Sequence, residues 1–185
     1  METGVVVHLL PGDDEAPYTF LAVRRWYGWS AGRLLVLDVG VGSLELGAGR
    51  DEHPDLAASL LLGASRLTRE WFTSDPPSRQ EMTALGEQLN AELAPLARRV
   101  REDRDAELTV GTSKTFRSLA RLTGAAPSSA GPRVRRVLTD AGLRQLVAFI
   151  SRMSSRDLGE LEGVSPGRAA HRSGNRVRGR TRPRW

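Results

Sequence analysis

Apolar residues recur with two different periods along this chain of 185 residues, and one of these periods is typical of strands. Residues 34–39 form an almost unbroken apolar run, 43–46 alternate polar and apolar residues, and 56–62 are again mostly apolar. These three neighbouring runs predict three adjacent strands of one sheet. Further strands are expected at 4–10, before a Pro-Gly turn, and at 107–113.

The second period is helical and fills the segments between the predicted strands. Residues 13–29 begin with acidic residues and then place apolar side chains at helical spacing, with Pro17 acceptable only in the first turn. The longest helical pattern covers 78–103, where Ser78 and Glu81 have the spacing of a capping box. Shorter helices are predicted at 65–72, 114–124 and 139–153. Because helices and strands alternate, we expect an α/β domain with a mixed sheet flanked by helices.

Composition narrows the class of protein. Hydrophobic residues make up 39% and charged residues 26% of the chain, which is typical of a globular protein. The sequence contains no cysteine, which excludes disulfides, thiolate zinc sites, iron–sulfur clusters and a cysteine nucleophile. No apolar run approaches the ~20 residues that a membrane helix needs, and the acidic start does not resemble a signal peptide. We therefore expect a cytoplasmic protein without membrane contact.

The net charge of +5 comes from the end of the chain. Residues 165–185 carry seven arginines and no acidic residue, whereas the remainder holds 20 basic and 22 acidic residues. We therefore expect a folded domain over 1–164 and a disordered arginine-rich tail over 165–185. Such a tail can also bind nucleic acid or another polyanion by counterion release, so a binding function for it stays open.

Candidate chemistry concentrates in the segment DVGVGSLEL. Asp38 ends a predicted central strand, at the edge where ligands usually approach α/β sheets. Gly40 and Gly42 permit a tight turn whose N–H groups suit phosphate oxygens. Ser43 and Glu45 are two positions apart on a predicted strand, so they share one face. Together these groups could hold a phosphoanhydride and a hydrated divalent cation.

Other motifs do not fit, and structural interpretations stay open. The segment lacks the third glycine of a dinucleotide fingerprint, residues 111–115 (GTSKT) lack the Walker A frame, and no G-x-S-x-G elbow is present. A β-hairpin with a structural glycine turn explains 38–46 without any ligand. Likewise, Glu15 can simply favour the positive end of a helix dipole.

Two segments resemble motifs of the Ppx/GppA family of exopolyphosphatases and guanosine pentaphosphate phosphohydrolases. Residues 38–46 resemble its phosphate loop D-I-G-G-G-S-x-E-L, and 11–23 resemble its G-x-x-E-A-R-L motif upstream. The similarity, closest to the actinobacterial members, extends over 4–165. It implies a ribonuclease H-like fold of the actin/hexokinase/Hsp70 superfamily, of which this chain would be mostly the second actin-like half.

The resemblance also implies hydrolysis of terminal phosphoanhydride bonds in polyphosphate or guanosine pentaphosphate, with Mg²⁺ or another divalent cation. Glu15 matches the general base that activates water, and Glu45 matches the second catalytic carboxylate. Asp38 matches the residue that holds the metal ion or its water. The positions that match the phosphate-binding loop are Gly40, Gly42 and Ser43. A homodimer is compatible with the same resemblance.

Departures from the family pattern predict an impaired chain. Val41 replaces the middle glycine of the loop, where a β-branched side chain can hinder a phosphate. Pro17 replaces an arginine that would attract a polyanion. The family's first half, with its D-x-G-S-N-S-x-R loop, has no counterpart in this sequence, and the similarity stops after 163–165. We therefore expect an incomplete domain. The alternative to an exopolyphosphatase-like hydrolase is a non-catalytic interaction module or an inactive gene remnant.

Overall fold

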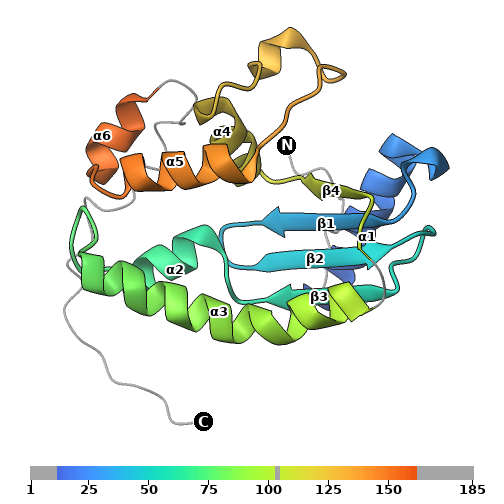
Figure 1. The fold of residues 1–185 in the computed structure, drawn as a ribbon, viewed down its shortest axis with the longest axis horizontal. Helices are drawn as coiled ribbons and strands as arrows, with labels where there is room; N and C mark the ends of the chain where they lie inside the picture. Colours follow the sequence, from blue (N-terminus) through green and yellow to red (C-terminus); the bar gives the residue numbers. More distant parts are fainter. Residues whose placement is uncertain (1–11, 103–104, 162–185) are drawn as a thin grey trace, which may run out of the picture.

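A mixed four-stranded sheet forms the centre of the protein (Figure 1). The computed structural model describes residues 12–102 and 105–161, so the strand predicted at 4–10 and the tail at 165–185 lie outside the described residues. The strands are β1 (Leu34–Val39), β2 (Leu44–Gly49), β3 (Leu56–Leu60) and β4 (Leu108–Gly111), in the order β3-β2-β1-β4. The β1–β2 and β2–β3 pairs are antiparallel, whereas β4 is parallel to β1. The predicted mixed sheet is confirmed.

Helices cover both faces of the sheet, as predicted. They are α1 (Gly12–Tyr27), α2 (Ala64–Trp71), α3 (Arg79–Glu102), α4 (Lys114–Leu122), α5 (Asp140–Ile150) and α6 (Ser155–Glu160), with short 3-10 helices η1 (Trp29–Ala31) and η2 (Ser128–Ala130). In Figure 1, α1 lies behind the sheet and α3 lies in front of its lower strands. Among the residues described, no helix has the length and apolar character of a membrane span.

Two apolar clusters, one on each face, fix the orientation of the strands. Phe20 and Val23 of α1 pack against Leu34 and Val36 of β1. The cluster on the other face joins β2, β3 and α3 through Leu46, Ala48, Leu56 and Leu96. Because neighbouring residues of a strand point to opposite faces, Asp38 lies on the same face as Val36, under α1.

Gly47 allows α1 to approach the sheet closely. A Cβ atom on Gly47 would lie 2.9 Å from the Cβ atom of Phe20, closer than real Cβ atoms come to a neighbour. Glu45 lies two positions before Gly47 on β2, so it shares the face that α1 covers. As a result every residue of β2 is buried, Glu45 included.

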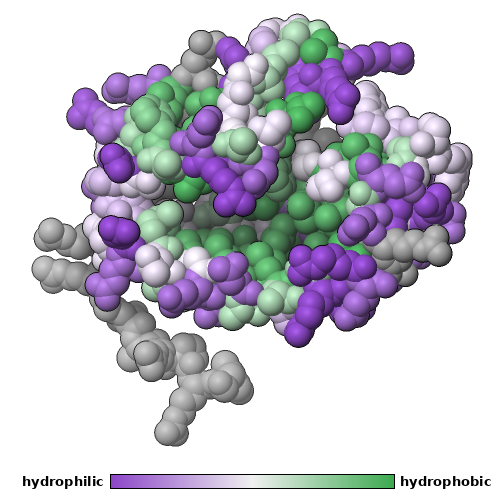
Figure 2. All heavy atoms as spheres, viewed as in Figure 1, coloured by the Kyte–Doolittle hydropathy of each residue, from purple (hydrophilic) through white to green (hydrophobic). Residues whose placement is uncertain are grey.

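The sheet face opposite α1 is covered less completely. Leu35 and Leu37 of β1 are only half-buried there, although they pack against the cluster around α3. Figure 2 shows an apolar hollow on this side of the molecule, between α3 and α5.

Local sequence signals correctly predict the start of the longest helix, α3. Ser78 and Glu81 form the predicted capping box of α3, with Glu81 N donating to Ser78 Oγ at 3.2 Å and Ser78 N donating to Glu81 Oε2 at 2.7 Å.

The prediction that confined Pro17 to a first turn is wrong, because α1 begins at Gly12 and continues through Pro17. Pro17 lies beyond the first turn, so the N–H that it lacks is one that would otherwise bond to the carbonyl oxygen four residues earlier in the helix. α6 was not predicted, although its Ser154 has a capping box.

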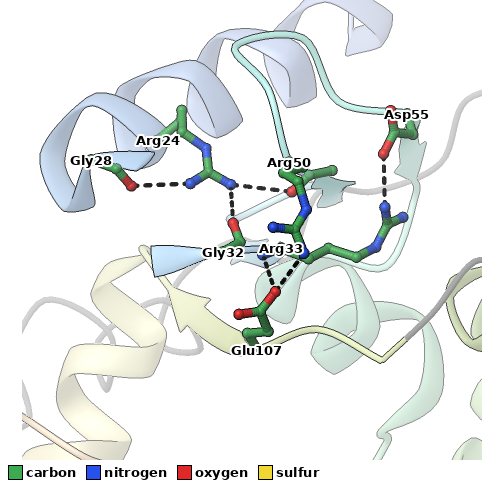
Figure 3. Close-up of polar contacts among 8 residues, drawn as sticks. Arg24, Gly28, Gly32, Arg33, Arg50, Asp55 and Glu107 are labelled. Carbon is green, nitrogen blue, oxygen red and sulfur yellow. Dashed lines mark hydrogen bonds and ion pairs between the residues drawn. The ribbon is translucent and has the colours of Figure 1, made fainter. Parts of the chain in front are cut away.

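The buried Arg24 side chain ties the end of α1 to the sheet (Figure 3). Its guanidinium donates to the carbonyl oxygens of Gly28 at 3.1 Å, Gly32 at 2.6 Å and Gly49 at 3.2 Å. The residue is only 1% exposed, and this burial is the main cause that lowers the pKa of Arg24. These bonds fix the orientation of α1 over β2.

Two ion pairs extend this network around the same end of the sheet (Figure 3). Arg33 pairs with Asp55 at 2.8 Å, and Arg50 pairs with Glu107 at 2.6 Å. The Glu107 carboxylate also accepts a bond from the backbone N–H of Arg33 at 3.1 Å. All four residues flank the strand ends opposite the one that carries Asp38, so this network fastens the far end of the sheet.

Candidate functional site

Four polar residues form a row across one end of the sheet. Asp38 of β1 lies directly opposite Glu45 of β2, and Glu45 lies opposite Ser59 of β3. Ser59 Oγ donates to Glu45 Oε1 at 3.3 Å. Thr112, the residue after β4, donates through Oγ1 to Asp38 Oδ2 at 2.6 Å. We call these four residues, Thr112, Asp38, Glu45 and Ser59, the polar row.

The two carboxylates of the polar row are unfavourable for stability. Like charges directly opposite each other on adjacent strands destabilise a sheet, and Glu45 is only 3% exposed. One hydroxyl donor for each carboxylate offsets part of this cost, because hydrogen bonds to ionised acceptors are strong. Charges kept at a costly position are typical of functional sites.

α1 brings Glu15 close to these two carboxylates. The pKa of Glu15 is raised, first by partial burial of its carboxyl group and then by the charges of Glu45 and Asp38. The residue as a whole remains exposed, so water can reach it. The three acidic residues predicted for the site therefore interact electrostatically, although they come from a helix and two strands.

The loop between β1 and β2 is fastened through its carbonyl groups. Gly40 N donates to Ser43 O at 2.9 Å and closes the turn. The carbonyl oxygens of Gly40 and Val41 accept bonds of 3.0 and 3.1 Å from the first amides of α2, residues 64–66. Within the described part of the chain, no hydrogen bond uses the N–H groups of Val41, Gly42 or Ser43. These three amides therefore have no partner among the described residues, whereas that of Gly40 has one.

The loop between β1 and β2 packs against Gly63 on one side and has no close neighbour at Gly42 on the other. Any side chain at Gly63 would clash with the backbone of Gly42 and Ser43, so Gly63 lies directly against the loop. A Cβ atom on Gly42 would have no neighbour within 4 Å. Val41, which replaces a glycine of the family pattern, points into solvent and is 61% exposed. The fold itself therefore does not require glycine at position 42.

Residues 112–115 complete this edge of the site from a distant part of the sequence. Thr112 N donates to Leu37 O at 3.0 Å, and Thr115 Oγ1 donates to Val39 O at 3.0 Å. Because β4 is parallel to β1, its C-terminal end lies beside Asp38. Sequence reasoning did not include Thr112 in the site. The available signal was a run of hydroxyl residues directly after a strand, where ligands approach α/β sheets.

The carboxylates do not form a complete metal site by themselves. Among residues 12–102 and 105–161, no group of three or more His, Asp or Glu side chains is close enough to hold a metal ion. Mg²⁺ is often held by only one or two carboxylates, with phosphate oxygens and water as its other ligands. Asp38 fits this type of site, because Oδ2 accepts the bond from Thr112 and Oδ1 accepts none from a described residue.

Comparison with known sequences connects this site to a family. The sequence profile of the Ppx/GppA phosphatase family matches residues 1–174. The chain is 63% identical over 168 residues to Exopolyphosphatase 1 of Mycobacterium tuberculosis, covering 91% of this chain and 49% of that relative. It is 60% identical over 168 residues to Exopolyphosphatase 1 of Mycobacterium leprae, covering 91% of this chain and 50% of that relative.

Solved structures show the same fold. The Aquifex aeolicus PPX-GPPA enzyme matches with a TM-score of 0.76 and 27% identity, over 91% of this chain and 55% of that chain. An exopolyphosphatase from Cytophaga hutchinsonii matches with a TM-score of 0.71 and 20% identity, over 85% of this chain and 51% of that one. The expected ribonuclease H-like, actin-like fold is confirmed, and this chain spans about half the length of its relatives. The chain belongs to the Ppx/GppA phosphatase family.

Proposed function

We propose that this chain hydrolyses the terminal phosphoanhydride bond of polyphosphate. Water attacks the terminal phosphorus, the bridging P–O bond breaks, and the products are inorganic phosphate and a polyphosphate one unit shorter. The observation that carries the proposal is the electrostatic coupling of Glu15, Asp38 and Glu45 beside a loop whose amides at 41–43 have no hydrogen-bond partner among the described residues. The names of the mycobacterial relatives favour the same substrate. Guanosine pentaphosphate offers a terminal phosphoanhydride of the same chemistry.

Glu15 is suited to take the proton from the attacking water. Partial burial and the charges of Glu45 and Asp38 raise the pKa of Glu15, which makes its ionised carboxylate a better proton acceptor. Because the residue is exposed, the proton can then leave to bulk water. Glu45, held by Ser59, would orient the same water from the side of the sheet.

A polyanion that approaches three carboxylates needs a compensating positive charge. Mg²⁺ or another divalent cation, held in part by Asp38, would supply this charge and polarise the terminal phosphate when bound. The amides of residues 41–43 and the Ser43 hydroxyl would bind phosphate oxygens. In this assignment the fold supplies the base, the orienting carboxylate and the phosphate contacts.

Release of inorganic phosphate from long-chain polyphosphate, in the presence of Mg²⁺, tests the proposal. Glu15→Gln keeps the size of the side chain and removes the base, so we expect kcat to fall by about 10²- to 10⁴-fold. The control is Glu52→Gln, which changes a surface carboxylate paired with Arg25 and should leave release unchanged. Wild-type rates in Glu15→Gln would overturn the proposal. Guanosine pentaphosphate is assayed in parallel.

A non-catalytic polyanion-binding or interaction module is the second candidate. It is favoured by the apolar hollow between α3 and α5 (Figure 2), because exposed apolar surface of this kind often marks an interaction site, and by the seven arginines at 165–185. Polyphosphate binding without phosphate release, equal in wild type and Glu15→Gln, would support this candidate against the first. Light scattering during size-exclusion chromatography tests the homodimer.

A further inference from the structure

Among residues 12–102 and 105–161, a single side chain from a distant part of the sequence donates to the Asp38 carboxylate. Thr112 Oγ1 lies 2.6 Å from Asp38 Oδ2 and 3.4 Å from Leu37 O. A hydroxyl has only one proton to donate, and the shorter contact to an ionised oxygen is the stronger one. The Thr112 hydroxyl proton is therefore directed at Asp38.

The position of Thr112 is itself fixed from both sides. Its N–H bonds to Leu37 O at 3.0 Å and extends the parallel β1–β4 pairing by one residue. The next residue, Ser113, caps α4 by accepting a bond from Phe116 N at 3.2 Å. Since threonine is also stiff about χ1, the backbone and the side chain together hold the hydroxyl in one place.

The second carboxylate of the polar row is held less tightly. Ser59 Oγ donates to Glu45 Oε1 at 3.3 Å, compared with 2.6 Å for Thr112 and Asp38. Each hydroxyl occupies one oxygen of its carboxylate. Within the described residues, the other oxygens, Asp38 Oδ1 and Glu45 Oε2, accept no hydrogen bond. Asp38 is thus the carboxylate with the more rigid orientation and one available oxygen.

We propose that Thr112 is a positioning residue of the site, which orients Asp38 so that Oδ1 is available to a divalent cation bound together with phosphate. This inference rests on the proposed function, because it gives Asp38 the role of a cation ligand. Thr112 touches neither substrate nor cation in this assignment. Its hydroxyl removes the rotational freedom of the carboxylate that the cation would otherwise have to restrict.

Binding of Mn²⁺ with methylenediphosphonate, a diphosphate analogue that is not hydrolysed, tests the inference without relying on catalysis. Water proton relaxation reports the bound Mn²⁺. Thr112→Val removes the hydroxyl at nearly constant shape, and we expect binding of Mn²⁺ to weaken by about tenfold, as is typical for loss of a partner that orients a metal ligand. Thr112→Ser keeps the hydroxyl, so its affinity for Mn²⁺ should stay within about twofold of the wild-type affinity.

The matched control is Thr109→Val, the same change at an exposed threonine of β4, which should leave binding unchanged. Melting curves show whether each variant is folded, and Thr112→Ala provides a second variant without the hydroxyl. Wild-type binding in Thr112→Val and Thr112→Ala would overturn the inference, as would equal losses in Thr112→Ser and Thr112→Val. Absence of Mn²⁺ binding to the wild type would also overturn it. If the expected binding pattern is found but the wild type releases no phosphate, the proposed function fails and the positioning role stands.

Discussion

Asp38 and Glu45 occupy directly opposite positions in the antiparallel β1–β2 pair, and both of their charges raise the pKa of Glu15 on α1. Of the two charges, that of Glu45 has the larger effect. Glu45 is also almost fully buried, and solvent screens the field of a buried charge less than that of an exposed one. The register of two strands thus adds to the effect of partial burial on the proton affinity of a helix residue.

Glu45→Gln should therefore lower the pKa of Glu15 more than Asp38→Asn does. Each variant removes one repulsive charge, but partial burial, the largest cause of the raised pKa, remains. Neither variant should return the pKa of Glu15 to its ordinary value. NMR titration of ¹³C-labelled glutamate measures this directly and does not depend on activity. Glu52→Gln is the control, and a larger shift in Asp38→Asn than in Glu45→Gln would contradict the prediction.

The sequence predicted the elements of the sheet because strand and helix periods are local signals. The runs at 34–39, 43–46 and 56–62 correspond to β1, β2 and β3 within one or two residues at most ends. β2 continues to Gly49, beyond the predicted alternation. Gly47 lets α1 pack closely against the second face of this strand, so both faces of β2 are buried. An alternating pattern indicates a strand with one solvent-exposed face, so this pattern could not show that Glu45 is buried.

The polar row could be predicted only in part. Asp38 and Glu45 follow from the glycine turn between two short strands, but the bond between Thr112 and Asp38 joins residues 74 positions apart. It exists because β4 pairs with β1 in parallel, and periodicity does not reveal the order of strands in a sheet. Arg24 was missed for a similar reason, since nothing local distinguishes a buried arginine of an amphipathic helix from a solvated one.

Glu15→Gln should change how stability depends on pH. Because the folded state raises the pKa of Glu15, folded protein binds more protons than unfolded protein between the unfolded and the folded pKa. The stability of the wild type therefore falls as pH rises through this window, and the variant lacks this decrease. We expect Glu15→Gln to melt higher than wild type at pH 7 and no higher at pH 4. A higher melting temperature of the variant only at pH 4 would contradict the sign.

Gly63→Ala should displace the loop between β1 and β2. A Cβ atom at Gly63 would clash with the backbone of Gly42 and Ser43, and forcing a methyl group into a packed contact costs about 1–3 kcal/mol. Urea denaturation measures this loss, and phosphate release should decrease as well if the loop binds phosphate. Gly86→Ala is the matched control, because a Cβ atom at Gly86 of α3 has no neighbour within 4 Å. That control should be stabilised by up to about 1 kcal/mol, and equal effects of the two variants would contradict the prediction.

Arg24→Met should loosen α1 from the sheet. The methionine side chain can fill much of the same buried space, but the carbonyl oxygens of Gly28, Gly32 and Gly49 lose the guanidinium as a donor. Gly28 O keeps a bond of 3.4 Å from Ala31 N. A buried acceptor that loses its partner costs roughly 1–3 kcal/mol, so we expect the free energy of unfolding in urea to fall by about 1–3 kcal/mol. Arg25→Met is the control, because the pair that Arg25 forms with Glu52 is exposed and such pairs contribute little.

The same variant also tests whether α1 positions Glu15. If Arg24 fixes the helix over β2, its loss should weaken the repulsion that Glu15 receives from Glu45 and Asp38, and the pKa of Glu15 should fall in the folded protein. Arg24→Lys keeps the charge but not the three-way geometry of the guanidinium, so we expect an intermediate stability. Unchanged stability in Arg24→Met would mean that burying the guanidinium costs as much as its hydrogen bonds contribute. In that case the packing of Phe20 against Gly47, and not Arg24, would hold Glu15 beside the polar row.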